Sequence, residues 1–543
     1  MSTAQPLRVK PNSDLGRRIY REGILPSGKP VRAIVQGDIA IAGTQFTCAS
    51  CHRRSGFGSS EGAAFVPPIA SSLLFGGREL RRTDLFRKLF QEIQPTRFRA
   101  RVRDPRGRPY YTDESLAAAL RDGKDPSGRE FDPLMPRYEL SEEDASHLVA
   151  YLKSLSAGSA PGVTRSEIHF ATIITDTVEP EKRRAILPVM EAYFRWKNAE
   201  TAGLLQRPGH AAFYDDDSYR PLREWVLHVW KLKGPEETWS KQLAAYYRKQ
   251  PVFALLGGVG EENWRPVHAF CERKEVPCIF PNTNLPVVSP LGAYTVYLSG
   301  GLTVEAQALA RHLAEKSGDT DSARVVQVYR DVGGGRVLAG ALYRSLREQG
   351  WSNLIEHEIH GARELSPAFW KELLEDERPS VLVLWLGEAD LMTLKTAQVP
   401  DEGVPEVYLS YRLLNSTLPS LPDSFRDKTF LTCPFTLPQA QTPHAYRARS
   451  WLRSRGIGRD HERMQLNTYF TLAVVDHSLT NLAGNFSRDY FIENVEHETE
   501  GTPNPGVFPG LSLGPGQRFA SKGSYIVKVS NGKIEAASSW IIP

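Results

Sequence analysis

Long apolar runs are missing from this sequence. No stretch reaches the roughly eighteen residues that a membrane-spanning helix needs. The first residues, Met1 to Arg18, are polar and contain no apolar signal-peptide core. Cysteine and methionine are scarce, with 5 of each in 543 residues, so each can be considered individually. We predict no membrane span and no nucleic-acid partner.

Several motifs of common catalytic sites are also missing. Gly333 to Gly335 is not followed by the Lys-Ser/Thr of a phosphate loop. His357 and His360 do not have the spacing of a His-Glu-x-x-His zinc motif. On a strand these two histidines face opposite ways, whereas on a helix they could share a metal. We find no convincing pair of nucleophile and base.

The chain is too long for one ordinary hydrophobic core, so two or three domains are expected. Residues 1–160 hold 25 Lys and Arg against 18 Asp and Glu, and the remainder holds 42 against 45. A basic first part favours docking to an acidic partner, although an ordinary solvated surface is an equal alternative. Small residues from Ser156 onward form a linker. We therefore predict domains at 1–156 and 166–543, with a linker at 157–165.

The most specific motif is Cys48-Ala-Ser-Cys51-His52. Two thiols three residues apart suit thioether bonds to two haem vinyl groups, and the adjacent imidazole then reaches the iron. A bare Cys-x-x-Cys could instead bind zinc, but no second cysteine pair lies nearby. The motif predicts one covalent haem c and a location outside the cytoplasm, in the periplasm. Since the chain shows no export signal, we expect that this signal has been removed; a misplaced start codon is the alternative.

Met135 is the candidate for the sixth iron ligand. It lies between Pro133 and Pro136 in Asp-Pro-Leu-Met-Pro, a stiff segment that fixes the sulfur in space. An axial thioether raises the haem potential and favours electron transfer. A methionine that fills a gap in the core is the alternative. His147, on an expected helix at 142–155, is a weaker rival and is expected to be a surface or packing residue.

Over residues 12–156 the chain resembles the class I cytochromes c. The residues that carry the resemblance are Gly16, Tyr20, the Cys48–His52 motif, Gly56-Phe-Gly58, Pro67-Pro68, Tyr111-Thr112, Leu116, Leu120, Gly123, Met135-Pro136 and Tyr151-Leu152. The resemblance implies an all-α domain with His52 and Met135 as axial ligands. It also implies a carbonyl near Pro67 or Pro68 that orients His52, and first and last helices that cross beside the haem.

Two features depart from that pattern or remain open. The 27 residues between Tyr20 and Cys48 form a longer insert than compact members have, and we expect an extra loop or hairpin there. Arg97, Arg99, Arg101 and Arg103 alternate with apolar residues and share one side if extended. They could pair with haem propionates, form a docking patch or simply be solvated.

From Ser166 onward, short apolar runs alternate with amphipathic stretches. Strands are expected at 169–175, 211–214, 252–256, 325–329, 381–386, 407–409 and 429–431. Helices are expected at 182–197, 263–273, 303–316, 336–349 and 464–482. Several strands are apolar without alternation, as in parallel sheets covered on both faces. This alternation predicts a doubly wound α/β fold with two lobes.

This second segment resembles the type I periplasmic binding proteins, the branched-chain amino-acid-binding group in particular. The residues that carry the resemblance are Phe213–Asp217, Phe253–Gly258, Val276–Pro281 followed by Asn282-Thr-Asn284, and Val325–Asp331 with its Gly-rich turn. It implies two α/β lobes with a ligand in the cleft between them. The expected lobes are 166–290 with 429–505, and 291–428 with 506–543.

By position in that fold, the cleft candidates are Gly260, Glu261, Asn282, Asn284, Tyr329, Asp331, Glu388 and Tyr411. Packing or capping is an equal alternative for each one. The first ligand loop has Gly260-Glu-Glu-Asn263 instead of small hydroxyl residues, so an α-amino acid ligand is not favoured. Glu261 and nearby aromatic residues suit a cationic or aromatic molecule. Cys271 and Cys278 could form a disulfide or be two buried thiols.

Three functions are compatible with these features. The first is a mono-haem electron-transfer protein whose binding lobes sense or recruit a small molecule. Its redox partner would be a periplasmic dehydrogenase, a terminal oxidase or another cytochrome. The second is a solute-binding protein of an ABC transporter with an accessory cytochrome. The third is a haem enzyme, which needs an open sixth position. We expect an electron carrier rather than a catalyst.

Overall fold

The computed structural model describes residues 10–61, 64–75, 109–205, 222–289, 292–316, 323–361, 363–397, 403–414, 421–440, 443–482, 484–530 and 533–543. It divides into two compact units. Unit 1 consists of Met1–Ala160 together with Asn485–Phe491, and unit 2 consists of Pro161–Gly484 and Ile492–Pro543. Among the described residues, no helix is long and apolar enough to cross a membrane. The strand predicted at 211–214, the motif Phe213–Asp217 and the four alternating arginines at 97–103 lie outside the described residues.

Unit 1 is built mainly from short helices. They are α1 (Ser13–Glu22), α2 (Cys48–His52), α3 (Ser71–Leu74), α5 (Asp113–Asp122) and α6 (Glu142–Ser154). Each longer helix has a local start signal: the Asn12 side chain caps α1, Thr112 and Ser115 form a capping box on α5, and the Ser141 hydroxyl caps α6. Gly23 and Gly123 end α1 and α5 in the left-handed conformation.

The first and last of these helices, α1 and α6, pack together as predicted. A Cβ atom on Gly16 would lie only 2.0 Å from the carbonyl oxygen of His147, so only glycine permits this approach. Further along the contact, the rings of Tyr20 and Tyr151 are 5.3 Å apart. Around them a single core gathers the buried side chains of α1, α5 and α6, and it includes Cys48.

Unit 1 also contains strands, which an all-α domain does not include. These are β1 (Arg32–Val35), β2 (Ile39–Ala42), β3 (Ser59–Glu61), β4 (Ala64–Val66) and β5 (Arg137–Glu139). The order β2-β1-β5 makes a small antiparallel sheet, and β3 pairs with β4. The β1–β2 hairpin occupies the insert between Tyr20 and Cys48, where an extra loop or hairpin was expected.

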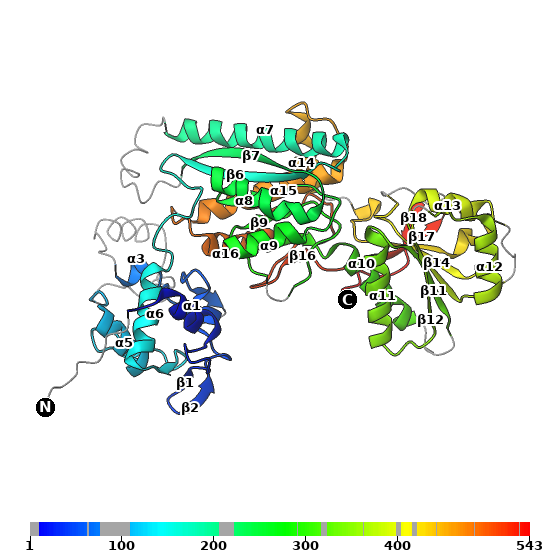
Figure 1. Ribbon diagram of the computed structural model, residues 1–543. Helices are drawn as coiled ribbons and strands as arrows, with labels where there is room; N and C mark the ends of the chain where they lie inside the picture. Colours follow the sequence, from blue (N-terminus) through cyan, green and yellow to red (C-terminus); the bar gives the residue numbers. More distant parts are fainter. Residues whose placement is uncertain are drawn as a thin grey trace. The chain divides into compact units, whose positions relative to one another are not determined.

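The described residues of unit 2 form two sheets, and the first has six strands in the order β16-β10-β9-β8-β6-β7. Its strands are β6 (Glu167–Thr175), β7 (Glu224–Leu232), β8 (Ala254–Leu256), β9 (Cys278–Ile279), β10 (Thr295–Ser299) and β16 (Phe519–Ser521), all parallel. The flanking elements are α7 (Pro180–Leu205), η3 (Glu236–Thr238), α8 (Trp239–Lys249), α9 (Arg265–Lys274), α14 (Pro443–Arg453) and α15 (Glu462–Asn481). Helix α16 (Arg488–Gly501) begins in the segment that belongs to unit 1 and continues from Ile492 in unit 2. Figure 1 shows α7 on one face of this sheet and α8 and α9 on the other.

The second sheet has seven strands in the order β12-β11-β13-β14-β15-β17-β18. Its strands are β11 (Val325–Arg330), β12 (Leu354–Ile359), β13 (Val381–Trp385), β14 (Glu406–Ser410), β15 (Thr429–Cys433), β17 (Tyr525–Ser530) and β18 (Lys533–Ala536). The accompanying helices are α10 (Gly301–Lys316), α11 (Gly334–Glu348), α12 (Pro367–Glu377) and α13 (Glu388–Lys395), with the short 3-10 turns η4 (Asp423–Lys428) and η5 (Pro438–Ala440). The last two strands run antiparallel to their neighbours, and the others are parallel.

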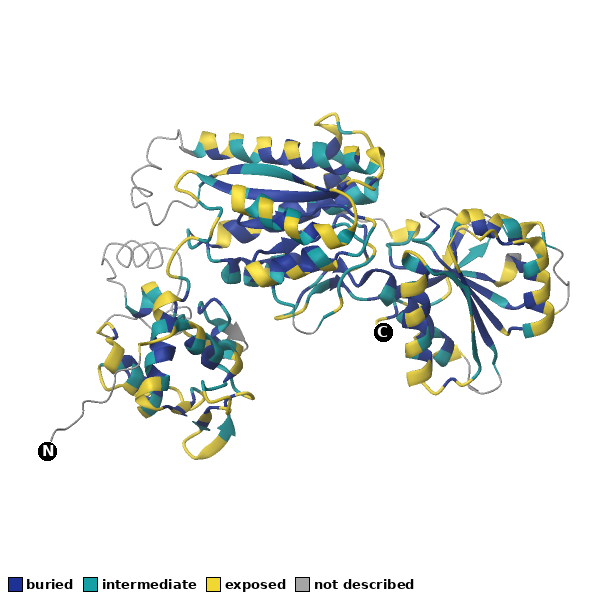
Figure 2. Ribbon diagram, viewed as in Figure 1, coloured by how far each residue is buried: buried dark blue, intermediate teal, exposed yellow. Residues whose placement is uncertain are grey.

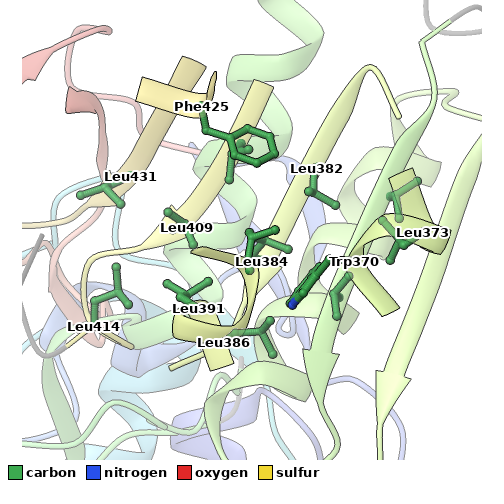
Figure 3. Close-up of a cluster of buried hydrophobic side chains, with 14 of the residues drawn as sticks. Trp370, Leu373, Leu382, Leu384, Leu386, Leu391, Leu409, Leu414, Phe425 and Leu431 are labelled. Atoms are coloured by element: carbon green, nitrogen blue, oxygen red, sulfur yellow. The ribbon is translucent and has the colours of Figure 1, made fainter. Parts of the chain in front are cut away.

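Each face of the second sheet has its own core. In one, Trp370 and Leu373 of α12 and Leu391 of α13 pack on leucines of the central strands, as Figure 3 shows. In the other, α10 and α11 cover the opposite face. Figure 2 shows buried strands in both sheets and exposed residues on the outward sides of the helices. The predicted α/β fold with parallel strands is therefore confirmed.

Some details differ from the expectations. The strands β10 and β16 belong to the first sheet and β15 to the second, so the crossovers between sheets lie elsewhere than at 290, 428 and 505. Strand β7 was not expected at all. Cys271 in α9 and Cys278 in β9 are buried thiols that form no disulfide.

Candidate functional sites

The haem motif forms the short helix α2. The Thr47 side chain accepts a hydrogen bond from the Ser50 N–H at 3.1 Å and starts the helix. Cys48 and Cys51 are three residues apart and therefore share one helical face. Cys48 is buried, and burial raises the pKa of its thiol to about 11, although a contact of 3.8 Å with the Tyr138 hydroxyl opposes that shift. Cys51 is half-buried.

His52 is 5% exposed, and its Nδ1 lies 3.0 Å from the carbonyl oxygen of Pro67. A carbonyl can only accept a hydrogen bond, so Nδ1 carries the proton. Burial lowers the pKa of the ring, while the Pro67 carbonyl opposes that shift. The neutral ring with its proton on Nδ1 leaves the Nε2 lone pair available for a metal. Pro67, rather than Pro68, supplies the orienting carbonyl.

Met135 is half-buried and packs against the same core that contains Cys48. Its N–H donates to the Asp132 carbonyl at 2.8 Å. The hairpin of the insert pins both ends of this loop: the Gln36 N–H donates to the Pro133 carbonyl at 2.9 Å, and β1 pairs with β5 directly after Met135. The roles of Gln36 and β5 were missed, since no local pattern joins positions so far apart.

His147, the rival of Met135, is 1% exposed in α6. Its Nδ1 accepts a hydrogen bond from the Asn12 N–H at 2.9 Å, at the start of α1. The Nδ1 lone pair is therefore already used in joining the two helices. The placement of His147 agrees with a packing role.

These side chains fit a covalent haem. The two thiols share a helical face, the imidazole is neutral and oriented, and the thioether lies on a pinned loop that packs on the core containing Cys48. Among the described residues no cluster of three His, Cys, Asp or Glu could hold a bare metal ion. Two thiols, an imidazole and a thioether are donors that suit attachment and ligation of a haem.

In unit 2, the first sheet reverses its strand order between β6 and β8. Such a switch point is where open parallel sheets place their ligands. The loop after β8 carries Gly260, Glu261 and Glu262. The Lys182 ammonium pairs with Glu261, whereas Glu262 accepts a hydrogen bond from Thr175 at 2.9 Å and another from Thr177. Glu261, the residue expected to attract a cation, is therefore already partnered.

A hollow of about 760 Å³ lies beside this switch point. Its lining residues are Asp176, Thr177, Gly234, Pro235, Glu236, Glu237 and Glu262. Two of the carboxylates are tied to backbone: Asp176 accepts from the Gly234 N–H at 3.0 Å and Glu236 from the Asn263 N–H at 2.9 Å. These residues were missed because several of them follow β7, the strand that was not expected.

The candidate amides Asn282 and Asn284 are both engaged within unit 2. Asn282 donates to the Gly258 carbonyl at 3.3 Å and accepts from the Asn467 side chain at 3.3 Å. Asn284 accepts from the Arg412 guanidinium at 2.9 Å. These contacts give both amides positioning or packing roles.

The remaining candidates lie at the ends of strands in the second sheet. Tyr329 and Asp331 lie at the end of β11, and Asp331 accepts from the Gly361 N–H and from His360, each at 3.1 Å. The Gly361 amide, followed by His360, lowers the pKa of the Asp331 carboxyl. Glu388 begins α13 at the neighbouring strand end. His357 lies within β12 and His360 just beyond it, so the expectation of opposite faces applies.

Tyr411, the last candidate, follows β14 next to a buried ion pair. The Arg412 Nε lies 2.8 Å from the Glu305 Oε1, and Glu305 is completely buried. The hydroxyls of Ser410 and Thr432 donate to Glu305 at 2.8 Å, and Arg412 donates to Ser299 at 2.9 Å. Burial raises the pKa of Glu305 and lowers that of Arg412. Of the eight cleft candidates, Asn284 contacts this pair through Arg412, and Tyr411 directly precedes Arg412 in the chain.

Residues 42–156 match the cytochrome c family model. This match confirms the resemblance predicted for the first segment and implies covalently bound haem. A comparison of the chain with curated protein sequences gives no significant match.

Three solved structures illustrate what the chain is similar to at low sequence identity. One is a leucine-binding protein from Thermotoga maritima, 13% identical, with a TM-score of 0.47, covering 69% of this chain and 99% of its own. Another is a branched-chain amino acid ABC transporter protein from Thermus thermophilus with bound valine, 12% identical, with a TM-score of 0.49 and coverages of 70% and 98%. A third is a fatty acid ABC transporter substrate-binding protein from Thermomonospora curvata, 14% identical, with a TM-score of 0.43 and coverages of 71% and 95%.

Proposed function

We propose that this chain is a periplasmic electron-transfer protein with one covalent haem c and a module that binds a small molecule. The observation that carries the proposal is the contact between the His52 Nδ1 and the Pro67 carbonyl within the Cys48–His52 motif. That contact fixes the ring and its tautomer, as is usual for a histidine that ligates a metal. This contact supports a cytochrome site in unit 1, in which His52 and Met135 would ligate the iron.

The residues of unit 1 define how such a site works. Cys48 and Cys51 would hold the haem covalently through their two thiols, and His52 and Met135 would ligate its iron. When bound, the haem supplies a one-electron couple, and a soft thioether ligand raises its potential. Burial of His52 and Cys48 excludes water from this side of the site. If His52 and Met135 both ligated the iron, the bound haem would supply electron transfer rather than the oxygen chemistry of a haem enzyme.

The small-molecule module is proposed for unit 2, at the carboxyl ends of the strands. The hollow beside the β6–β8 switch point carries four carboxylates, which favours a cationic ligand. A dehydrogenase, an oxidase or another cytochrome would exchange electrons with unit 1. Ligand binding would then recruit or gate that exchange.

The test of this function is mass spectrometry on the natively purified chain, followed by reduction kinetics. We expect covalent attachment of one haem and a non-covalent ligand that leaves on denaturation. Reduction by a dehydrogenase should change in rate when that ligand is removed. Absence of covalent haem would overturn the cytochrome assignment, and an unchanged rate and potential would overturn the coupling.

A transport-type solute-binding protein with an accessory cytochrome is the second candidate. The two-sheet α/β fold of unit 2 favours it. It predicts ligand affinity that is the same for the oxidised and the reduced chain. Isothermal titration in both redox states separates it from the first proposal, because coupling between two sites must act in both directions.

A further inference from the structure

Unit 1 includes a segment from near the far end of the sequence, Asn485–Phe491. Backbone and side-chain contacts fix this segment: the Ala160 N–H donates to the Phe486 carbonyl at 3.0 Å, and the Ser156 and Ser487 hydroxyls are 3.1 Å apart. Phe486 and Phe491 are buried, at 1% and 0% exposure. Its contacts therefore place Asn485–Phe491 among the residues that build the unit carrying the haem motif.

Asp489 in this segment contacts two arginines of unit 1. Its carboxylate lies 2.7 Å from the Arg21 Nη2 and 3.2 Å from the Arg54 Nε. Asp489 is 16% exposed and Arg21 11%, so this ion pair is largely shielded from solvent. Arg21 belongs to α1, whereas Arg54 follows His52 by two residues. Asp489 thus joins α1 to the loop that leaves the haem motif.

Tyr490 reaches the same loop. Its ring stacks on Phe57 with centroids 4.0 Å apart and planes inclined by 20°. The loop, residues 53–58, has positive φ at Arg53, Gly56 and Gly58, an unusual conformation for Arg53 that surrounding contacts must maintain.

Three contacts from the N-terminal part of unit 1 also hold this loop. The Tyr20 hydroxyl donates to the Arg53 carbonyl at 2.7 Å, and the Ser156 hydroxyl donates to the Ser55 carbonyl at 2.8 Å. The Gly58 N–H donates to the His52 carbonyl at 3.1 Å and so ties the loop to the histidine itself. A displacement of residues 53–58 would therefore shift the position of His52.

We propose that Asp489 and Tyr490 are positioning residues of the haem site. They hold residues 53–58, and through them His52, in the arrangement that ligates iron. The Asp489 carboxylate also offsets the two guanidinium groups next to that loop. The inference rests on the proposed haem site and adds to it a structural and electrostatic contribution from residues more than 430 positions beyond the motif.

Two substitutions in the full chain test this inference. Asp489→Asn removes a negative charge next to Arg21 and Arg54, so the oxidised state becomes less favourable and the midpoint potential rises. Tyr490→Leu removes the ring contact, so amide hydrogen exchange of residues 53–58 becomes faster, by roughly fivefold, as expected for one aromatic pair. Exchange of helix α5 should stay unchanged.

The matched controls separate positioning from general loss of structure. Glu130→Gln breaks the exposed pair with Lys124 in the same unit and should leave the potential where it is. Asp489→Glu keeps the negative charge and should have the wild-type midpoint potential. Tyr490→Phe keeps the ring and should have the wild-type rate of amide hydrogen exchange. If the other two variants accumulate poorly, these two conservative variants remain as folded proteins for comparison.

Two results overturn the proposal. One is an Asp489→Asn potential equal to that of Glu130→Gln, and the other is equal exchange in Tyr490→Leu and Tyr490→Phe. Failure of the proposed function gives a different result, because the natural chain then carries no covalent haem. Hydrogen exchange of residues 53–58 still tests the positioning role in that case.

Discussion

Met135 is held by residues that lie far away in the sequence. Gln36 fixes the loop before it through the Pro133 carbonyl, and Tyr138, three residues after it, reaches Cys48 at 3.8 Å. Because the chain is restrained both before and after Met135, this methionine is well suited to hold its sulfur at a fixed position for binding a metal. It is poorly suited to the alternative, a flexible side chain that fills a gap.

The Met135→Ala variant should therefore keep the haem but lose the absorption band that marks methionine ligation. We expect covalent haem at the wild-type level, because Cys48 and Cys51 are unchanged. The weak red charge-transfer band of methionine-ligated ferric haem should disappear, and the potential should fall. Visible spectroscopy with a redox titration measures both. Met392→Ala, at a residue that is 47% exposed, is the control; a persisting band in Met135→Ala would exclude this ligand.

The buried pair of Glu305 and Arg412 gives a prediction about stability. Arg412→Met leaves the Glu305 charge buried without its partner, which costs about 3–5 kcal/mol of unfolding free energy. The double variant with Glu305→Leu should recover much of that loss, because it removes both charges. Denaturation followed by tryptophan fluorescence measures this, since all 10 tryptophans lie in unit 2. Additive losses would show that the two residues act independently.

Local spacing explains which site residues could be predicted. The Cys48–His52 motif and Met135 between its prolines are visible within a few residues, and the resemblance supplied Pro67. The roles of Gln36, Glu262 and Arg412 were missed because they arise from contacts with residues that are distant in the sequence. For the cleft, the expectation named Glu261, whereas its neighbour Glu262 lines the hollow.

Among the helices, two glycine-to-alanine substitutions should change stability in opposite directions. Gly16→Ala in α1 would place a methyl group 2.0 Å from the His147 carbonyl and should destabilise unit 1 by about 1–3 kcal/mol or more. Gly340→Ala in α11 meets nothing within 4 Å and should stabilise unit 2 by about 1 kcal/mol. Thermal unfolding followed at the haem and at the tryptophans distinguishes the two units. A stable Gly16→Ala variant would contradict this close crossing.

Strand β7 shows why some elements escaped prediction. Residues 224–232 read Glu-Trp-Val-Leu-His-Val-Trp-Lys-Leu, with charged or polar side chains between apolar ones. Because β7 is an edge strand, only part of it is buried, so it lacks the continuous apolar run that identified β8 and β13. The pairing of β5 with β1 was equally hidden, because the paired residues lie about 100 positions apart.

Over unit 2 as a whole, three histidines predict acid sensitivity. Burial lowers the pKa values of His228, His268 and His312 in the folded state. Below the usual value of about 6.5, the unfolded chain therefore binds more protons than the folded one, and stability falls as the pH falls. Tryptophan-detected melting from pH 7.5 to 5.5 tests this. His228→Gln should weaken the trend, whereas His497→Gln, at an exposed residue, should not.

Because unit 1 is built from two segments that are distant in the sequence, its parts are synthesised at different times. A ribosome that adds about 5–20 residues per second produces Asn485–Phe491 tens of seconds after residue 160. During that interval the Cys48–His52 motif exists without Asp489 and Tyr490, and its following loop lacks two of its restraints. The order of synthesis thus leaves an early period in which the set of contacts that holds residues 53–58 is incomplete. Arrival of the last part of the chain then completes it.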